Sequence, residues 1–461
     1  MKKSIYIVGG TRPEAIKLFP IIYHLKSSAM PFIFIWSGQH YDYEMSRIFF
    51  EEIGIRPDYE LGVGSGTQGV QVAKIIQSIE DFLGRTNEKG ILVAVGDTNT
   101  VLGASLAASK MGWIFAHVEA GLRSFDRYMP EEINRLVADH VANIMFAPST
   151  QAVLNLLYEG LDPWRIYLTG NTIVDAVKMI SPRVEKERDR VLSELGVEEP
   201  YALVTLHRAE NVDHADRLGR ILKSFKDISR EIQLIFPLHP RTRKRIEEFG
   251  LDKLLSGIKV IKPLGYFEFL SLLSKAEVVF TDSGGVQEEA FTLNVPCITL
   301  RRNTERPETV WLGGNILVGD DPERIINAYK YVRDNRGKIV EKIRLSNNPY
   351  GDGKAGERIT NILKLLVEDY EFFKKYAYDI NNEPDYRDLD YPNYIVINGS
   401  AFEGITIKDF HEKFPGTYIT LIYDEKGRPV IPYSDIVIKG TWKLRVWGPR
   451  KILEFLVNTN R

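Results

Sequence analysis

The feature that most constrains the fold of this chain is a repeated alternation of short apolar segments with helical ones. The predicted strands are Ser4–Val8, Phe32–Trp36, Ile91–Val95 and Ile114–Val118, then Tyr201–Leu206, Gln233–Pro237, Lys259–Ile261, Val278–Thr281 and Pro296–Leu300. Helical segments such as Glu14–Leu25, Gly69–Leu83 and Thr100–Lys110 lie between strands of the first series. Strands that alternate with helices form parallel sheets covered on both faces. The two series therefore predict an α/β protein with two doubly wound domains.

Length and composition agree with several domains in one chain. The 461 residues exceed what one core usually supports, and 44% hydrophobic with 26% charged residues is ordinary for a soluble globular protein. The net charge of -2 gives no electrostatic reason to expect nucleic acid or an anionic membrane as the main partner. The chain enters a strand at Ser4, and we see neither a signal peptide nor an apolar span that could cross a bilayer. We expect a cytoplasmic protein.

The single cysteine, Cys297, excludes an intramolecular disulfide, which fits a reducing compartment. It lies in a strand-like run, so a buried structural thiol is favoured over a nucleophile. We find no CxxC, HExxH or EF-hand pattern, so the sequence offers no ligand set for a tightly bound metal.

The boundary between the two series falls near residues 171–200, where the charge run Arg183–Arg190 is typical of a solvated helix. The amino-acid composition changes again after Leu366. Residues 381–393 are rich in Asn, Asp, Pro and Tyr and predict a linker. Residues 394–461 are strand-rich, with a turn at Gly427–Pro429, and predict a small α+β domain.

The run Thr281–Ala290 directly follows a predicted buried strand and contains Ser283, Gly284 and Gly285. A strand that turns into a helix here exposes backbone N–H groups at a helix N-terminus, where both these donors and the helix dipole favour a phosphate. The glycines let a ligand approach the backbone closely. The alternative is a plain strand-to-helix turn in which Ser283 caps the helix.

Other polar residues follow the strands of the first series. Arg12 lies in a Gly-rich turn, where an anion contact is favoured over a plain surface charge. Asp97 follows the third strand, and on sequence alone a helix cap is favoured over a catalytic carboxylate. Glu119 follows the fourth strand, and Glu131 with Arg135 can form an ordinary helical ion pair. Three carboxylates at one edge of a sheet nevertheless predict an acid and a base near neutral pH.

Ten ordered motifs carry a resemblance over residues 1–366. They are GTRPEAIK (10–17), GQH (38–40), GDT (96–98), HVEAGLR (117–123), PEEINR (130–135), GNTIVDA (170–176), HRAEN (207–211), TDSGGVQEEA (281–290), TERPE (304–308) and NPYGDGKAGER (348–358). Together they resemble the non-hydrolysing UDP-N-acetylglucosamine 2-epimerases. The resemblance implies a GT-B fold: Rossmann-like domains at 1–171 and 172–352 with an interdomain cleft, and a helix at 353–366 that returns to the first domain. A linker at 367–393 and the accessory α+β domain at 394–461 would follow.

The resemblance further implies reversible conversion of UDP-GlcNAc to UDP-ManNAc without metal or cofactor, through elimination of UDP to 2-acetamidoglucal and its re-addition. The resemblance also implies that the enzyme is a cytoplasmic homodimer whose product is used in cell-surface polysaccharide synthesis. The implied catalytic residues are Asp97, Glu119, Glu131 and His207. The implied substrate-binding residues are Arg12, Lys17, Arg135, Phe267, Ser283, Gly284, Gly285, Glu289 and Arg306.

Two departures and several alternatives remain. Ala209 stands where many bacterial members have arginine, and Tyr41–Glu44 also differ, so we expect weak or no activation by a second UDP-GlcNAc molecule. A UDP-diacetamido sugar could replace UDP-GlcNAc as substrate, a hydrolysing epimerase would release UDP, and a glycosyltransferase would need an acceptor site. A sugar-nucleotide sensor would not need the carboxylates. Residues 394–461 resemble the TrkA-C type ligand-binding module of potassium-transport regulators, which suggests either ligand sensing or oligomerisation.

Overall fold

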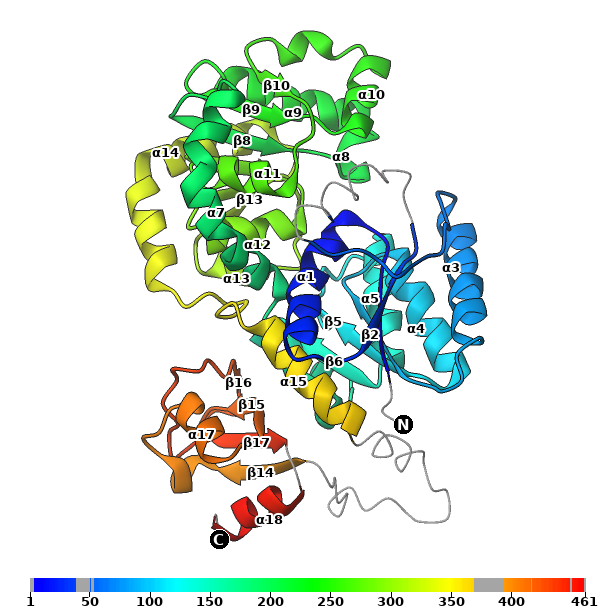
Figure 1. The fold of residues 1–461 in the computed structure, drawn as a ribbon. Coiled ribbons are helices and arrows are strands. Elements are labelled where there is room, and N and C mark those ends of the chain that lie inside the picture. The colour runs from blue at the N-terminus through cyan, green and yellow to red at the C-terminus, as the bar shows by residue number, and fades with distance from the viewer. Residues whose placement is uncertain are drawn as a thin grey trace. The chain divides into compact units, whose positions relative to one another are not determined.

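The computed structural model describes residues 4–38, 50, 54–368, 394–415, 417–447 and 450–459 (Figure 1). The predicted motif at Gln39–His40, the departure at Tyr41–Glu44 and the linker at 381–393 lie outside these residues. The chain divides into two compact units. The first comprises Met1–Leu122, Arg127–Asp175 and Tyr350–Arg461, and the second comprises Arg123–Asp126 and Ala176–Pro349. The predicted domain bounds themselves stay predictions.

The first unit contains a parallel seven-stranded sheet in the order β3-β2-β1-β4-β5-β6-β7. Its strands are β1 (Ile5–Gly9), β2 (Phe32–Trp36), β3 (Tyr59–Glu60), β4 (Ile91–Val95), β5 (Ile114–Val118), β6 (Ile144–Ala147) and β7 (Ile166–Leu168). Its helices are α1 (Arg12–Ser27), α3 (Gln68–Leu83), α4 (Asn99–Met111), α5 (Pro130–Val141), α6 (Thr150–Tyr158), η1 (Pro163–Arg165) and α15 (Ala355–Glu368). The strands β1 and β4 are buried at every position, as expected for central parallel strands.

The second unit contains a parallel six-stranded sheet in the order β10-β9-β8-β11-β12-β13. Its strands are β8 (Tyr201–Thr205), β9 (Gln233–Pro237), β10 (Lys259–Ile261), β11 (Val278–Thr281), β12 (Cys297–Thr299) and β13 (Asn315–Leu317). Its helices are α8 (Ala209–Val212), α9 (Ala215–Ile228), α10 (Pro240–Glu248), η2 (Asp252–Leu255), α11 (Tyr266–Leu273), α12 (Gly284–Thr292), α13 (Pro307–Trp311) and α14 (Pro322–Leu345). The helix α7 (Thr172–Glu194) begins in the first unit and continues into the second, and it contains the charge run predicted to be helical.

Both sheets have a point at which the strand order reverses. In the first sheet β1 lies between β2 and β4, and in the second β8 lies between β9 and β11. Ligands of doubly wound sheets bind beyond the carboxyl ends of the strands at such a point. The turns that follow β1, β4, β8 and β11 carry the motifs predicted to be functional. Topology therefore gathers these motifs, within each unit, at the expected binding edge.

The predicted α/β class with two Rossmann-like sheets is confirmed, and Cys297 is buried in β12 as predicted. Burial raises the pKa of its thiol to about 12, which makes it a poor nucleophile. The strands β3, β6, β7 and β13 were not predicted. Each has only two to four residues, and so short a run shows no clear periodicity.

Helix α15 packs directly against α1, which begins at the carboxyl end of β1 (Figure 1). The two helices approach closely at Gly356, where a Cβ atom would lie 2.8 Å from Pro20 Cβ and 3.0 Å from its carbonyl oxygen. The Asp175 carboxylate accepts a 2.7 Å hydrogen bond from the Gly356 amide. The segment after Pro349 is thereby fixed to the first sheet.

We expect Gly356→Ala to lower the free energy of unfolding by about 1–3 kcal/mol, because the added methyl group forces α15 away from α1. Gly337→Ala is the matched control, since nothing lies within 4 Å of a Cβ atom at that position in α14. It should stabilise the chain by up to about 1 kcal/mol. Thermal unfolding of both variants tests this, and equal melting temperatures would contradict the close packing.

The C-terminal residues form the predicted small α+β domain. Its antiparallel sheet has the order β14-β17-β15-β16, with β14 (Tyr394–Asn398), β15 (Tyr418–Tyr423), β16 (Pro429–Val430) and β17 (Lys443–Trp447). Its helices are η3 (Gly399–Phe402), α17 (Ile407–Lys413) and α18 (Arg450–Thr459). The predicted hairpin is present, although Pro429 begins β16 instead of ending the turn.

This domain is bound to the first sheet at β7. The buried Arg445 donates hydrogen bonds to the carbonyl oxygens of Pro163 and Ile166, and its guanidinium carbon lies 4.8 Å from the centre of the Tyr167 ring. Leu421 and Ile431 join the apolar core of the first sheet. The attachment therefore combines apolar burial with an arginine whose charge is shared by backbone carbonyls and an aromatic face.

His411 of α17 makes the stability of this domain depend on pH. Burial, helped by the charge of Arg358, lowers the pKa of His411 to about 4 from an ordinary value near 6.5. The unfolded chain therefore binds a proton more readily, and stability is lost as pH falls from about 6.5 towards 4. His411→Gln, which retains an acceptor for the Ile419 amide, should lose less stability between pH 7 and pH 5 than the native chain. Thermal unfolding of both proteins at the two pH values measures this loss. An equal fall in the melting temperature of the variant and of the native chain would contradict this assignment.

Candidate active site

Glu119 lies directly after β5 in an uncommon backbone conformation. Its φ is 71°, and the amides of both Glu119 and Ala120 donate to the carbonyl oxygen of Phe146 at 3.0 and 3.1 Å. The left-handed region costs a residue with a side chain about 1–2 kcal/mol. Non-glycine residues held in this way are concentrated at functional sites. The turn directs a 4% exposed Glu119 to the carboxyl end of the sheet.

Two side chains hold the Glu119 carboxylate. Lys17 of α1 forms an ion pair and hydrogen bond with Oε2, and Asn171 Nδ2 donates to Oε1 at 3.1 Å. Lys17 is itself buried, so each charge compensates the other where water is scarce. The strand-end motifs of β1, β5 and β7 therefore meet at one carboxylate.

His117 and Asp139 form hydrogen bonds that hold the turn carrying Glu119 in place. The Nδ1 atom of His117 lies 2.6 Å from Asp139 Oδ1, and its Nε2 atom lies 2.7 Å from the Gly96 carbonyl oxygen. The other carboxylate oxygen of Asp139 accepts the Gly121 amide at 3.0 Å. Both side chains are fully buried. They connect the turn after β4 to the turn that carries Glu119.

Asp97 follows β4, and the helix-cap alternative for it is wrong. Thr98 occupies the N-cap position of α4 and accepts the Thr100 amide. The Asp97 carboxylate instead forms an ion pair with Arg135 of α5, and Asn134 Nδ2 donates to the Asp97 carbonyl oxygen at 2.9 Å. Arg135 also contacts Glu132 at 2.9 Å. The Asp97 side chain is 27% exposed.

Glu14 was missed in the sequence, although it joins two of these turns. Its carboxylate accepts hydrogen bonds from the Gly10 amide and from the amide and hydroxyl of Thr11, at 2.7–2.9 Å. Thr98 donates to its other oxygen at 2.6 Å. Burial raises the pKa of Glu14 to about 7 despite these donors. The Thr-x-x-Glu spacing of a capping box was the available signal.

Arg12 and Glu131 are the remaining predicted residues of the first unit. Arg12 is the first residue of α1, and Glu131 lies in the first turn of α5, one residue after Pro130. Both are partly exposed. Each therefore stands at a helix N-terminus near the carboxyl edge of the sheet.

In the second unit, Thr281–Gly285 forms the predicted strand-to-helix turn. Ser283 occupies the N-cap position of α12, yet its hydroxyl does not accept a helix amide, so the simple capping alternative is not supported. A Cβ atom at Gly284 would lie 2.5 Å from the Arg306 guanidinium and the Glu305 carboxylate, so only glycine fits. Open space lies beside Gly285. The amide end of α12 is accessible to an anion.

His207 is held by Asp282 across the neighbouring strand ends. Asp282 is fully buried and accepts the backbone amides of His207 and Arg208 at 3.0 and 2.8 Å. The His207 ring lies 3.2 Å from the carboxylate, and its side chain is 43% exposed. Burial alone would raise the pKa of Asp282. The charge of His207, together with the hydrogen bonds that His207 and the Arg208 amide donate to the carboxylate, outweighs burial and lowers the pKa overall. Asp282 thus orients an exposed imidazole.

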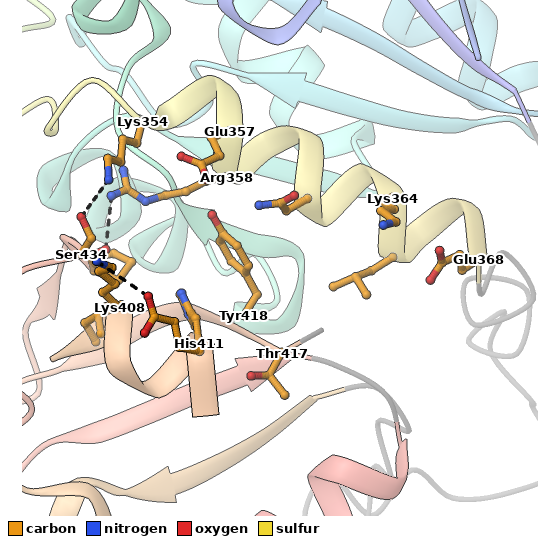
Figure 2. A pocket seen from close by; sticks show the side chains of 15 residues that line it. Lys354, Glu357, Arg358, Lys364, Glu368, Lys408, His411, Thr417, Tyr418 and Ser434 are labelled. Carbon is orange, nitrogen blue, oxygen red and sulfur yellow. Dashed lines mark hydrogen bonds and ion pairs between the residues drawn. The ribbon is translucent and has the colours of Figure 1, made fainter. Parts of the chain in front are cut away.

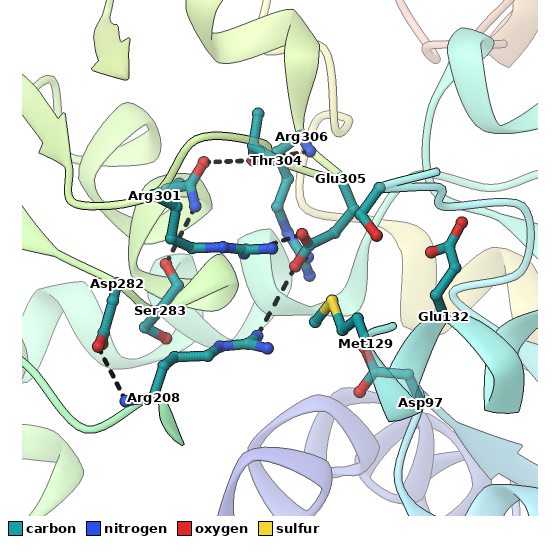
Figure 3. Close-up of polar contacts among 12 residues, drawn as sticks. Asp97, Met129, Glu132, Arg208, Asp282, Ser283, Arg301, Thr304, Glu305 and Arg306 are labelled. Atoms are coloured by element: carbon teal, nitrogen blue, oxygen red, sulfur yellow. Dashed lines mark hydrogen bonds and ion pairs between the residues drawn. The ribbon is translucent and has the colours of Figure 1, made fainter. Parts of the chain in front are cut away.

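Three arginines converge beside this turn (Figure 3). Glu305 contacts Arg301 at 2.9 Å, Arg208 at 3.9 Å and also Arg306. Arg306 further contacts Glu288 at 3.1 Å. Buried carboxylates therefore hold a cationic cluster in place, as binding of a diphosphate requires.

The last two predicted residues are buried. Glu289 lies within α12 with 5% exposure. Phe267 lies in α11, where the Arg183 guanidinium covers its ring at 4.1 Å from the ring centre. Phe267 thus stacks with a side chain of its own unit.

Comparisons with known proteins agree with this arrangement. The sequence profile of the family described as UDP-N-acetylglucosamine 2-epimerase matches residues 24–364. The UDP-N-acetylglucosamine 2-epimerase of Methanocaldococcus jannaschii is 49% identical over 371 residues, which cover 79% of this chain and 99% of that protein. The chain belongs to the UDP-N-acetylglucosamine 2-epimerase family. Residues 394–461 lie beyond the matched region of the profile.

A solved structure and one further relative are also informative. A crystal structure of the M. jannaschii UDP-GlcNAc 2-epimerase with UDP-GlcNAc and UDP is similar with a TM-score of 0.73 and 48% identity, over 78% of this chain and 99% of that one. The UDP-2,3-diacetamido-2,3-dideoxy-D-glucuronate 2-epimerase of Pseudomonas aeruginosa is 39% identical over 79% of this chain and 100% of its own length.

Within the described part of the chain, we find no group of three His, Cys, Asp or Glu side chains that could hold a metal ion. Among the described helices, none has the length and apolar character needed to span a bilayer.

We expect Asp139→Asn to cost about 1–3 kcal/mol of stability, because either His117 or the Gly121 amide loses a buried acceptor. The control Asp189→Asn removes a carboxylate of the same size that is 85% exposed and should change stability by less than about 0.5 kcal/mol. Denaturant unfolding measures both. An Asp139 variant as stable as the control would contradict the proposed support of the Glu119 turn.

Proposed function

We propose that this chain catalyses the reversible epimerisation of UDP-GlcNAc to UDP-ManNAc at C2. The observation that carries the proposal is the buried Glu119, held by Lys17 and Asn171 at the carboxyl end of β5. Membership of the epimerase family supports the substrate, since the M. jannaschii relative at 49% identity is named for UDP-GlcNAc.

The reaction we propose is an elimination followed by an addition. A base takes the proton from C2 while the bond between C1 and the UDP oxygen breaks, which yields 2-acetamidoglucal and UDP. An acid then returns a proton to C2 on the opposite face, and UDP adds back to C1. Asp97, Glu119 and Glu131 are the proposed acids and bases, with Lys17 and Arg135 as the cations that pair with two of them.

The C2 proton is weakly acidic because no carbonyl group is adjacent to it, so charge on the departing diphosphate must be stabilised strongly. We propose Arg12, His207, Arg306 and the amides of Ser283, Gly284 and Gly285 for this purpose. Glu289 would bind the ribose hydroxyls, and Phe267 would contribute to substrate binding. The open space beside Gly285 and the exposed His207 ring support these roles.

The resemblance of the ordered motifs to the family supports a proposal for the compartment, the oligomeric state and the use of the product. We propose a cytoplasmic homodimer whose product serves cell-surface polysaccharide synthesis. Ala209 begins α8 in place of the arginine of many bacterial members, which supports weak or absent activation by a second UDP-GlcNAc.

Proton NMR of the purified chain with UDP-GlcNAc in D2O tests the proposal. UDP-ManNAc with deuterium at C2 is the expected product. An unchanged spectrum over hours would reject the enzyme in favour of a sensor, and accumulating free UDP would favour the hydrolysing alternative. The P. aeruginosa relative makes a UDP-2,3-diacetamido uronate the second substrate to assay. A higher kcat/KM on that sugar would reassign the substrate.

Glu119→Gln should lower kcat by about 10²–10⁴-fold, because the amide cannot transfer the proton and no longer pairs with Lys17. Affinity for UDP should change little, because the proposed UDP contacts lie elsewhere. Glu88→Gln, at an exposed loop position, is the matched control and should retain full activity. A loss of less than about tenfold in kcat for Glu119→Gln would exclude Glu119 as an acid or base.

A further inference from the structure

A cavity of about 600 Å³ lies within the first unit between α15 and the C-terminal domain (Figure 2). One wall consists of Lys354 and of side chains of α15, and the other consists of α17, the start of β15 and the segment around Ser434. The volume falls in the range of small-molecule sites, about 300–1,000 Å³. The C-terminal wall lies outside the matched family region, so the proposed epimerisation does not account for it.

One end of the cavity is basic. Lys354 Nζ donates to Ser434 Oγ at 3.2 Å, and Figure 2 shows Lys408 beside them. Among the described residues, the Lys408 ammonium group contacts Glu412 at 3.7 Å, beyond hydrogen-bond distance. Each ammonium group carries three donors, so these contacts leave donors for a ligand. The nearby Arg358 forms an ion pair with Asp352 through hydrogen bonds of 2.7 and 2.8 Å, so its charge is already balanced and the donors for a ligand are those of Lys354 and Lys408.

The middle of the cavity presents a flat aromatic wall. The rings of His411 and Tyr418 are stacked, with centres 5.0 Å apart and planes 16° apart. His411 accepts the Ile419 amide at 3.1 Å, which fixes its ring. Because its pKa is lowered to about 4, this imidazole is neutral at physiological pH. Asn361 of α15 contributes an amide to the lining from the other wall. Stacked rings beside hydrogen-bonding groups suit a planar heterocycle.

We propose that this cavity is a second ligand site that binds a nucleoside monophosphate, with the phosphate between Lys354, Lys408 and Ser434 and the base against Tyr418 and His411. The basic end and the aromatic middle of the cavity differ in the way such a ligand requires, since an anion and a planar ring occupy different parts of the molecule.

The cavity is connected to the candidate active site of the same unit. Arg358, in its wall, donates to the Pro432 carbonyl oxygen at 3.3 Å and to the Thr169 carbonyl oxygen at 2.9 Å. Asn171, two residues after Thr169, donates to Glu119. Occupancy is therefore expected to alter the rate of epimerisation. This consequence rests on the proposed function, whereas binding itself does not.

Isothermal titration of the full chain with 5′-AMP tests the site, because binding is measured without any turnover. The double variant Lys354→Met, Lys408→Met should bind AMP at least about tenfold more weakly, as expected for lost charge-assisted contacts. The matched control Lys413→Met, Lys426→Met removes the same charge from the same domain outside the cavity and should bind as the native chain does.

A third variant keeps the test decisive if the double variant unfolds. Tyr418→Leu should weaken AMP binding while leaving binding of inorganic phosphate unchanged, because only the ring wall is altered. Three results would each overturn the proposal. The first is no AMP binding by the native chain at about 10 mM, a concentration above the dissociation constants of useful sites. The others are AMP binding that is weakened equally in the control double variant, and AMP binding that neither the lysine changes nor the tyrosine change affects. A native chain that binds AMP but lacks epimerase activity would leave this site in place and reject the proposed function alone.

Discussion

The buried contact between Lys17 and Glu119 is the interaction on which the rest of the first unit depends. It joins α1 to the turn after β5, and Asn171 extends it to the segment after β7. Removing one partner would leave the other charge buried and uncompensated, which is among the most costly changes a protein interior can suffer. The positive φ of Glu119 adds a cost that the surrounding hydrogen bonds must offset. Such an arrangement is hard to explain as stabilisation and is easily explained as preorganisation for chemistry.

The second unit uses the same principle with opposite charge. There, buried carboxylates such as Glu305 and Asp282 hold arginines and His207 around the N-terminus of α12. The first unit thus presents carboxylates paired with cations, and the second presents cations fixed by carboxylates. Proton transfer at a sugar carbon and retention of a diphosphate require these two environments.

Much of this could be predicted from sequence, because the carboxyl ends of parallel strands meet at one edge. Residues that follow strands, such as Asp97, Glu119 and Ser283, could therefore be placed at the edge of a sheet from the sequence, and their roles stay predictions. Residues that support them across the fold were not. Asp139 lies in the last turn of α5, 18 residues from the Gly121 amide whose hydrogen bond it accepts, and nothing in the nearby sequence marks it as a supporting residue. In the sequence Arg445 is likewise an ordinary charged residue of a strand. In the structure it links the C-terminal domain to β7 through hydrogen bonds to backbone carbonyl oxygens.

The central claim is that carboxylates of the first unit move the C2 proton while the C1–oxygen bond of UDP breaks. Positional isotope exchange tests it most directly, with UDP-GlcNAc that carries ¹⁸O in the bridge between C1 and the β-phosphate. Elimination frees the β-phosphate to rotate before UDP adds back. We expect ¹⁸O to move from the bridging to the non-bridging positions in recovered UDP-GlcNAc, seen as a shift in its ³¹P NMR signal. Retention of ¹⁸O in the bridge during exchange of the C2 proton with solvent would contradict the account.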